Sequence, residues 1–471
     1  MSSSSDTIFA LSSGRPPAAI AVIRISGPKA RDALKALTGR IPEPRKAALA
    51  RVRGADGDII DEALALWFPG PNSETGEDIA ELQLHGGRAV IAAVIDALGQ
   101  CDGLRPAEAG EFTRRAFENG KLDLTAVEGL ADLVMAETQA QRRQAFRQLK
   151  GLLGDRAENW RQRLIAALAL IGARIDFSDE GDVQDSGADK LLSGALGIAR
   201  ELANEIAQAL DDGRHGERLR DGLVVAIAGP PNAGKSTLLN RIARREAAIV
   251  SPYAGTTRDV IEVHLDLGGY PVTLLDTAGI RESADPVEIE GVRRAQERAA
   301  EADLVLWVID ASELGGMPKK PADDQAIWLV ANKLDRVAAK NEQTFIVNEQ
   351  LFASEYEFIK SELPFISRET FFGLSATTGQ GVEPLLARLA DYAGETLGGS
   401  EPALITRSRH RRTLEDVLAA LRRAQAEPAA SQDDLLAEEL RLAAQALGRL
   451  TGRVDVEDVL DVIFRDFCIG K

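Results

Sequence analysis

The chain has 471 residues, of which 45% are hydrophobic, and a formal net charge of −17. This length predicts two or three domains. The two cysteines, Cys101 and Cys468, exclude a disulfide framework and favour a reducing compartment. No apolar run approaches the ~18 residues of a membrane span, and the first residues lack the basic segment of a secretion signal. We therefore expect a cytoplasmic protein without a membrane segment.

Residues 1–120 mix short strands with helices. Strand patterns are expected at 18–26 (AAIAVIRIS), 63–69 (ALALWFP) and 79–85 (IAELQLH). The segment 88–100 (RAVIAAVIDALGQ) has the apolar spacing of a helix. This mixture predicts a first domain of the α+β class.

Two later stretches, 121–217 and 396–471, are rich in leucine and alanine at helical spacing. The pattern predicts a loop at 177–187 and long helices over 124–138, 160–175, 411–425 and 433–452. The tail of about 70 residues would form a marginal core alone. We therefore expect both stretches to pack into one helical domain, with a separate domain at 218–395 inserted between them.

The inserted segment begins with the pattern of a phosphate-binding loop. Gly229–Ser236 reads GPPNAGKS, follows the apolar run LVVAIA and precedes TLLNRIA. The GxxxxGK[ST] spacing between a strand and a helix turns backbone N–H groups toward phosphate oxygens. Lys235 would reach the terminal phosphates, and the Ser236 hydroxyl would bind Mg²⁺. The nucleotide contacts predicted here are Asn232, Ala233, Gly234, Lys235, Ser236 and Thr237.

Further segments complete the pattern of a GTPase. Asp276–Gly279 (DTAG) ends an apolar run, and its aspartate would hold a Mg²⁺ water. Thr257, in the segment GTTRD, is a second candidate hydroxyl for Mg²⁺. Asp335, in the segment NKLD, would accept two N–H groups from guanine but would meet a lone pair on adenine, so the sequence predicts GTP. The contacts predicted in these segments are Thr257, Asp276, Thr277, Ala278, Gly279, Asn332, Lys333, Asp335, Ser375 and Ala376.

The position that carries a water-orienting glutamine in Ras-like GTPases is Ile280. A hydrocarbon side chain neither orients nor polarises water, so another group must stabilise the transition state. From the residues alone, an arginine and a cation bound beside the phosphates both stay open.

Motifs along the whole chain carry a family resemblance. Those of the inserted segment and the tail are GPPNAGKS, GTTRD, DTAGIRES and the terminal FCIGK. Those of the N-terminal part are AAIAVIRISGPKA, TGEDIAELQLHGG and GEFTRRAFENGKLDL. Together they resemble the MnmE (TrmE) family of bacterial tRNA-modification GTPases from residue 6 to the last residue. The resemblance implies a multidomain fold: an α+β tetrahydrofolate-binding and dimerisation domain (1–120), an α-helical domain (121–217 and 396–471, ending in CIGK) and an inserted α/β P-loop (Ras-like) G domain (218–395).

The resemblance also implies how the gap at Ile280 is filled. In this family a potassium ion at the interface of two paired G domains replaces an arginine finger and neutralises charge that develops on the phosphates. The family's catalytic glutamate falls on Glu288, although from the sequence alone an acidic helix start is the ordinary interpretation. The potassium ligands would be Asn232 and the backbone carbonyls of Ser251, Tyr253 and Thr256, and Ser251 and Thr256 would also contact GTP.

The N-terminal domains of a homodimer would form the folate pocket of the family. The positive side chains suit the carboxylates of the glutamate tail and the glutamate suits the amidine-like edge of the pterin, with ordinary surface charges as the alternative. Glu74 stands where the family usually has an aromatic residue, and Pro230 replaces a polar residue of the phosphate loop. The folate contacts implied are Arg24, Glu81, Lys121 and Lys471.

The activity implied is GTP hydrolysis in the modification of the tRNA wobble uridine. With an FAD-binding MnmG (GidA) partner, in a heterotetramer or larger complex, the protein would add a (carboxymethyl)aminomethyl group to C5 of that uridine. The one-carbon donor would be 5,10-methylenetetrahydrofolate, with 5-formyltetrahydrofolate as its analogue, and FAD and NADH would come through the partner. Cys468 is a candidate nucleophile toward the pyrimidine ring or, in the plainer reading, a small buried residue. Because the chain is acidic, we expect the partner to supply most of the tRNA contact.

Two other classes stay open. A ribosome-assembly GTPase would account for the G domain, but such proteins usually add a KH module or a second G domain, and the sequence has neither a second phosphate loop nor a GxxG loop in its tail. A regulatory GTPase would leave the N-terminal domain and the CIGK ending without a purpose. Binding of a reduced folate separates the enzyme from both.

Overall fold

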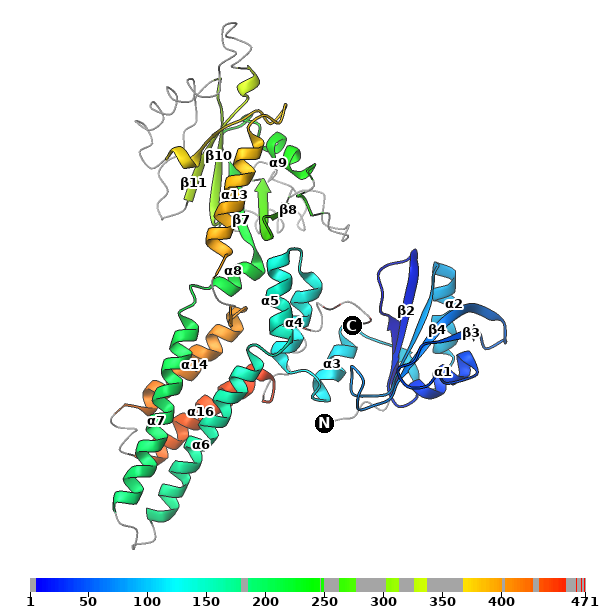
Figure 1. Cartoon of the computed structure of the whole chain (residues 1–471), viewed down its shortest axis with the longest axis vertical. Coiled ribbons are helices and arrows are strands. Elements are labelled where there is room, and N and C mark those ends of the chain that lie inside the picture. The colour runs from blue at the N-terminus through cyan, green and yellow to red at the C-terminus, as the bar shows by residue number, and fades with distance from the viewer. Residues whose placement is uncertain are drawn as a thin grey trace, which may run out of the picture. The chain divides into compact units, whose positions relative to one another are not determined.

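The computed structural model describes residues 6–178, 185–245, 247–249, 262–276, 302–312, 326–336, 367–399, 403–426 and 432–454, and the single residues 463, 467 and 470. The chain divides into two compact units (Figure 1). The first comprises residues 1–131, 147–207 and 412–471, and the second comprises 132–146 and 208–411. The predicted multidomain fold class is confirmed, while the predicted domain boundaries stay a prediction.

The first unit contains a six-stranded sheet with the order β3-β4-β5-β2-β1-β6. Neighbouring strands are antiparallel except β1 and β6, which are parallel. The strands predicted at 18–26, 63–69 and 79–85 are confirmed. The bounds are β1 Thr7–Leu11, β2 Ala18–Ser26, β3 Ala48–Arg53, β4 Ile59–Phe68, β5 Ile79–Gly86 and β6 Leu104–Pro106.

The two faces of this sheet have different neighbours. Helices α1 (Ala30–Thr38) and α2 (Arg88–Gly99) cover one face, and their leucines, isoleucines and valines join the strands in one core. On the other face, Phe112 of α3 (Glu111–Glu118) packs against Ile8 and Ala10 of β1. Because side chains alternate along a strand, every second residue of β2, β4 and β5 points to this second face.

Long helices form the rest of the first unit. Helix α16 (Asp433–Thr451) packs along α6 (Gly154–Ser178), and Arg174 and Asp433 form an ion pair of 2.8 Å between them. The indole of Trp160, fully buried on α6, donates to Glu205 of α7 (Asp185–Leu210) at 2.9 Å. Three further helices, α4 (Leu124–Met135), α5 (Gln139–Leu149) and α14 (Ser408–Ala424), begin in one unit and end in the other.

The predicted loop at 177–187 is wrong at both ends. Helix α6 extends to Ser178, so its last two residues fall inside the predicted loop. Helix α7 begins at Asp185, since an acidic residue is favourable in a first helical turn.

The second unit is built on a six-stranded sheet with the order β12-β11-β10-β7-β9-β8. All neighbours are parallel except β8 and β9, which form an antiparallel pair. The bounds are β7 Leu223–Ala228, β8 Glu262–Leu267, β9 Tyr270–Asp276, β10 Leu304–Asp310, β11 Ala326–Asn332 and β12 Phe371–Gly373, with helices α8 His215–Asp221, α9 Lys235–Ala243 and α13 Val382–Leu397 and the 3₁₀ turn η1 Arg368–Thr370. Apolar residues of α9 and α13 pack on the strands to form the core.

The carboxyl ends of β7, β9, β10 and β11 meet at one edge of this sheet, because the four strands are parallel. Ligands of open α/β sheets bind outside this edge. Among the helices that the structure describes, none is long and apolar enough to cross a membrane.

Candidate functional site: a nucleotide site and an N-terminal pocket

The phosphate loop connects β7 to α9. Gly229 has a φ of +135° and Gly234 a φ of +97°, and a Cβ at either position would overlap a neighbour, the Val308 carbonyl oxygen in the first case and the Asn332 amide in the second. Glycine is therefore required at both positions. Asn232 also has a positive φ of 62°. Successive turns of this kind point backbone N–H groups into a concave anion site.

The side chain of Lys235 folds back onto the phosphate loop. Its buried ammonium donates to the carbonyl oxygens of Gly229 and Pro230, at 2.8 Å each. Burial lowers the pKa of Lys235, while the nearby Asp276 carboxylate opposes that change. The ammonium is thus held over the loop by carbonyl groups, where a triphosphate would give it a better partner.

The Ser236 hydroxyl donates to a carboxylate oxygen of Asp276 at 2.6 Å. Asp276 is buried at the end of β9, and Ile227 of β7 is its partner across the sheet. A hydroxyl and a carboxylate in contact form an oxygen donor pair of the kind that Mg²⁺ prefers. The structure therefore brings together Ser236, predicted to bind Mg²⁺, and Asp276, predicted to hold a water of Mg²⁺. Thr237 follows in the first turn of α9 and is exposed.

The motifs predicted to bind the base contact one another and the phosphate loop. The buried Asn332 amide donates to the Ala233 carbonyl at 2.8 Å and accepts from the Ala376 N–H at 2.9 Å. The Ser375 hydroxyl donates to Asp335 Oδ1 at 2.6 Å. Asn332 therefore joins three segments, and Ser375 orients the carboxylate that would read guanine.

Asp310 is a residue of this site that the sequence reasoning missed. The register places it beside Asn332, and its carboxylate accepts from Lys333 Nζ at 2.7 Å. Burial raises the pKa of Asp310, but the hydrogen bonds from Lys333 and Ser312 outweigh burial and lower it to about 2. Its position at the end of the apolar run LVLWVID was the available signal, because parallel strands bring their ends together.

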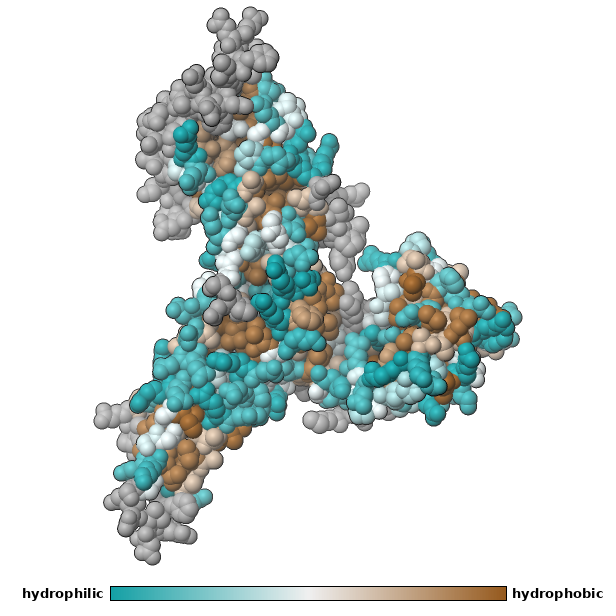
Figure 2. All heavy atoms as spheres, viewed as in Figure 1, coloured by the Kyte–Doolittle hydropathy of each residue, from teal (hydrophilic) through white to brown (hydrophobic). Residues whose placement is uncertain are grey.

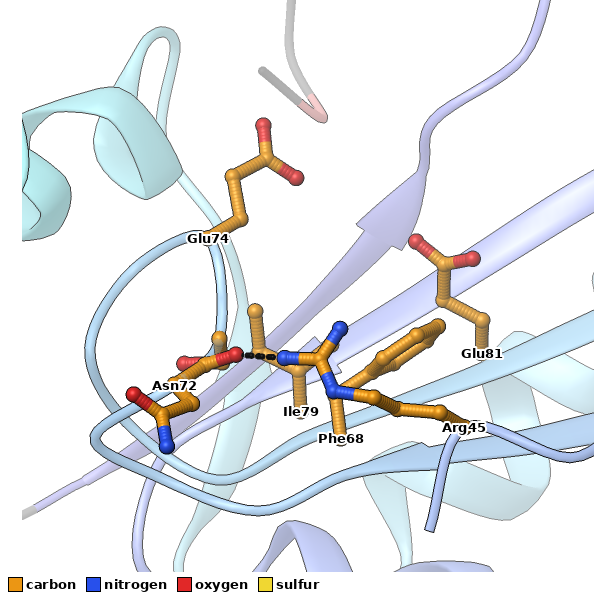
Figure 3. A pocket seen from close by; sticks show the side chains of 7 residues that line it. Arg45, Phe68, Asn72, Glu74, Ile79 and Glu81 are labelled. Carbon is orange, nitrogen blue, oxygen red and sulfur yellow. Dashed lines mark hydrogen bonds between the residues drawn. The ribbon is translucent and has the colours of Figure 1, made fainter.

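A second candidate site is a pocket of about 270 Å³ in the N-terminal part. Strands β4 and β5 form its floor, and the loop 70–78 forms its rim. Figure 3 shows the side chain of Arg45 passing Phe68, with its guanidinium directed to the backbone carbonyl of Asn72. The lining residues are Arg45, Phe68, Asn72, Ser73, Glu74, Ile79 and Glu81.

The predicted folate contacts lie around this pocket. Arg24 is opposite Glu81 on the neighbouring strand and donates to its Oε1 through Nε and Nη2, at 2.9 Å each. Its third contact is an ion pair of 2.7 Å with Glu74. Lys121, which is exposed, donates to the Pro71 carbonyl of the rim loop at 2.8 Å. The structure therefore brings together three of the four residues predicted for folate.

A buried ion network fixes the rim loop. Arg115, only 3% exposed, contacts Glu77 at 3.2 Å and Glu111 at 3.0 Å. Glu77 also accepts from the Ser26 hydroxyl of β2 at 2.7 Å, and Ser26 shares a hydrogen bond of 2.8 Å with Thr75. These residues were missed as a group, although the motifs TGED and GEFTRR contain most of them.

The end of the chain reaches the same sheet. The Ser12 hydroxyl donates to the Gly470 carbonyl at 2.8 Å. Gly470 has a φ of +100°, and a Cβ there would overlap the Leu11 carbonyl oxygen at the end of β1. Only glycine therefore fits at this position of the CIGK ending.

Two family models match almost the whole chain. The model of the MnmE helical domain matches residues 124–468, and the model of the GTP-binding protein TrmE N-terminus matches residues 7–121. The tRNA modification GTPase MnmE of Rhodopseudomonas palustris (strain BisB5) is 56% identical over 471 residues, which cover 100% of both chains. The protein of the same name from Azorhizobium caulinodans is 53% identical over 472 residues, again 100% of both.

The chain belongs to the MnmE family of tRNA modification GTPases. The predicted family is thereby confirmed. Among solved structures, the G domain of the T. maritima FeoB iron transporter matches 36% of this chain and 98% of its own length, at 24% identity and a TM-score of 0.24. A score this low supports no conclusion about fold or function.

Several predicted site residues of this family member lie outside the described part of the chain, and their roles stay predictions. They include the catalytic candidates, most of the potassium ligands, the second Mg²⁺ hydroxyl and the last folate contact. These residues are Ser251, Tyr253, Thr256, Thr257, Thr277, Ala278, Gly279, Glu288, Cys468 and Lys471.

Proposed function

We propose that this protein is a potassium-dependent GTPase that modifies C5 of the tRNA wobble uridine together with an FAD-binding MnmG (GidA) partner. It would use the one-carbon unit of 5,10-methylenetetrahydrofolate to add a (carboxymethyl)aminomethyl group. The observation that carries the nucleotide part is the set of contacts made by Asn332, which joins the phosphate loop to both base-binding segments. Membership of the MnmE family carries the tRNA part.

The nucleotide site selects guanine through Asp335. The Ser375 hydroxyl donates to its Oδ1 and orients the carboxylate, and both oxygens keep a lone pair for the N1–H and the 2-amino group of guanine. Adenine offers a lone pair at N1, and a site built on polar pairing rejects such an analogue strongly. Lys235 leaves its two carbonyl partners for the terminal phosphates, whose negative charge stabilises the ammonium.

Two cations complete the hydrolytic site in this proposal. Ser236 and Asp276 fit Mg²⁺, because a hydroxyl and a carboxylate already meet there. Asn232 would be the side-chain ligand of K⁺: it is exposed in the phosphate loop with a positive φ. Bound cations supply positive charge beside the phosphates as negative charge develops. Glu288 would orient the attacking water.

The N-terminal pocket suits a flat heterocycle with N–H donors. Phe68 and Ile79 form an apolar floor, and the carboxylates of Glu74 and Glu81 border it. Reduced folates present such an edge on their pterin ring, which supports the prediction that this is the folate site. The contact of Gly470 with Ser12 brings the end of the chain to the same sheet, in line with a role for Lys471.

A homodimer is part of the proposal. Ile20, Leu49 and Leu64 lie on the face of the N-terminal sheet opposite α1 and α2, and are 59%, 60% and 41% exposed. Leu49 and Leu64 face each other across β3 and β4. Figure 2 shows apolar residues gathered over β2 and β4. Clustered apolar side chains of this kind favour a protein interface, and a second copy that completes the folate pocket is the partner the family suggests.

The GTP cycle would act as a gate in this scheme. Pairing and separation of two G domains would reorganise the tRNA-modifying site, while the chemistry on the base takes place elsewhere. Cys468 would attack the pyrimidine ring, or would pack as a small residue beside the folate. Because a net charge of −17 disfavours binding to phosphates, MnmG would supply most contacts to tRNA.

Steady-state GTP hydrolysis in potassium, rubidium and sodium buffers tests the hydrolytic part, with Asn232→Ala for comparison. We expect strong stimulation by potassium that is lost in the variant. Equal rates in all three salts would mean that an arginine or an external activator completes the site. Equilibrium dialysis with 5-formyltetrahydrofolate tests the folate part, and failure to bind would favour a purely regulatory or ribosome-assembly GTPase.

A further inference from the structure

Glu74, Arg24 and Glu81 form a triad at the rim of the N-terminal pocket. Arg24 uses Nε and Nη2 on Glu81 and Nη1 on Glu74, with distances of 2.9, 2.9 and 2.7 Å. The side chains of Arg24 and Glu81 are only 17% and 16% exposed, whereas that of Glu74 is 56% exposed. One guanidinium therefore faces two carboxylates, which leaves the triad with a net charge of −1.

The guanidinium of Arg24 is fixed from several directions. Its strand pairs with β5 so that Arg24 and Glu81 stand directly opposite each other. The ring of Phe112 lies 5.8 Å from its central carbon. Its Nε and Nη2 contact Glu81 and its Nη1 contacts Glu74, so the carboxylate of a ligand would have to compete with Glu74 for Nη1. Arg24 is therefore a positioning residue, which holds the carboxylate of Glu81 in place.

Glu81 keeps one oxygen for the pocket. Both bonds from Arg24 end on Oε1, and within the described residues no hydrogen bond reaches Oε2. The carboxylate borders the floor formed by Phe68 and Ile79 (Figure 3). A ligand that fills this space thus meets an acceptor from Glu81 and the negative charge of Glu74.

We propose that Glu74 is a specificity-determining residue. Its carboxylate occupies Nη1 of Arg24 and adds negative charge, which disfavours anions, so that the pocket selects the N–H donor edge of a pterin. This inference rests on the proposed folate site and refines it. The carboxylates of the glutamate tail would bind away from Arg24, in contrast to the role predicted for Arg24 from the sequence. Removal of the Glu74 charge would free Nη1 of Arg24 and admit an anionic group.

Two fragments of folate separate these possibilities. The first, 6-methyltetrahydropterin, has the donor edge without the anionic tail. The second, 4-aminobenzoylglutamate, has the tail carboxylates without the pterin. Affinities of the full-length protein for both fragments and for 5-formyltetrahydrofolate are measured by calorimetry, first for the unmodified chain and then for Glu74→Gln.

We expect Glu74→Gln to weaken 6-methyltetrahydropterin and to strengthen 4-aminobenzoylglutamate, so that the ratio of their dissociation constants changes at least about tenfold. The matched control is Glu62→Gln on the same sheet. Glu62 is 54% exposed and pairs with Arg51 at 2.9 Å, so it carries an ordinary surface ion pair. It should leave the ratio within about twofold.

The outcomes separate this inference from the proposed function. If the unmodified protein binds 5-formyltetrahydrofolate but Glu74→Gln changes the ratio no more than Glu62→Gln does, the inference is wrong and the folate site stands. If the unmodified protein binds neither folate nor the pterin fragment, both are wrong. Because Glu74 is largely exposed, the variant should fold normally, which thermal unfolding verifies.

Discussion

The nucleotide site and the N-terminal pocket use two different kinds of sheet. In the second unit, parallel strands end at one edge, and the short motifs that directly follow these strands in the sequence meet there. In the first unit, the pocket lies on the face of an antiparallel sheet, where Arg24 and Glu81 meet from neighbouring strands and a loop held by Arg115 completes the rim. The nucleotide site at the sheet edge (the edge site) can therefore be recognised from local motifs. The pocket on the sheet face (the face site) depends on pairing between residues that are distant in the sequence.

The largest expected effect concerns the edge site. Asp335→Asn replaces the carboxylate that we propose reads guanine by an amide. The amide cannot accept from both N–H groups, and its NH₂ group would meet the 2-amino group of guanine. We expect GTP affinity to fall by at least ~10³-fold, while affinity for xanthosine triphosphate rises, because xanthine has a carbonyl at C2. Titration with both nucleotides measures this. Equal losses for both would show that Asp335 supports the fold and does not read the base.

The next effect concerns the face site. Arg115→Ala removes the buried cation shared by Glu77 and Glu111. Glu77 would keep the Ser26 hydroxyl and Glu111 would keep Arg105, but the charge that joins the two carboxylates would be lost. The cost is about 3–5 kcal/mol of unfolding free energy in the first unit. Urea unfolding followed by hydrogen exchange of residues 70–78 measures it, with GTP affinity of the same variant as the internal control. A rim loop that exchanges as slowly as before would contradict the assigned role of Arg115.

A smaller effect depends on pH. Burial raises the pKa of Glu111, but hydrogen bonds from Arg105, the Glu108 N–H and Arg115 outweigh it and hold the pKa below its ordinary value of 4.5. A pKa that is lower in the folded state gives stability that is present above about pH 4.5 and is lost as the pH falls through the folded value.

Glu111→Gln should therefore lower the free energy of unfolding by about 2 kcal/mol at pH 7. The difference from the unmodified protein should shrink as the pH falls below about 4.5. Unfolding midpoints in urea at pH 4, 5 and 7 measure this. A difference that stays constant over this range would mean that shape, and not charge, makes Glu111 important.

The smallest effect concerns the end of the chain. Gly470→Ala would force a Cβ into the Leu11 carbonyl at a φ of +100°. We expect a loss of about 1–3 kcal/mol from docking of the chain end, read as faster hydrogen exchange near Ser12. Gly57→Ala is the matched control, since its φ is +88° and nothing lies within 4 Å of the added Cβ. Exchange near Ser12 that is as slow in Gly470→Ala as in Gly57→Ala would contradict the predicted overlap with Leu11.

The fold class and the nucleotide motifs could be predicted because their signals are local. The apolar run at 18–26 predicted the strand β2, and the spacing of Gly229–Ser236 predicted the turn before α9. Asp310 was missed because only the register of β10 with β11 brings it to Lys333. The triad of Glu74, Arg24 and Glu81 was missed because it joins a loop and two strands.

The central claim is that the nucleotide site and the N-terminal pocket serve one reaction on tRNA. The most direct measurement combines the purified protein with MnmG, its proposed partner, and with unmodified tRNA, GTP, 5,10-methylenetetrahydrofolate, FAD, NADH, and glycine or ammonium. Mass spectrometry of the digested tRNA then follows the wobble uridine. We predict a C5-modified uridine that disappears with Asp335→Asn and, independently, with Glu81→Gln. A modified uridine that persists in either variant would contradict the claim.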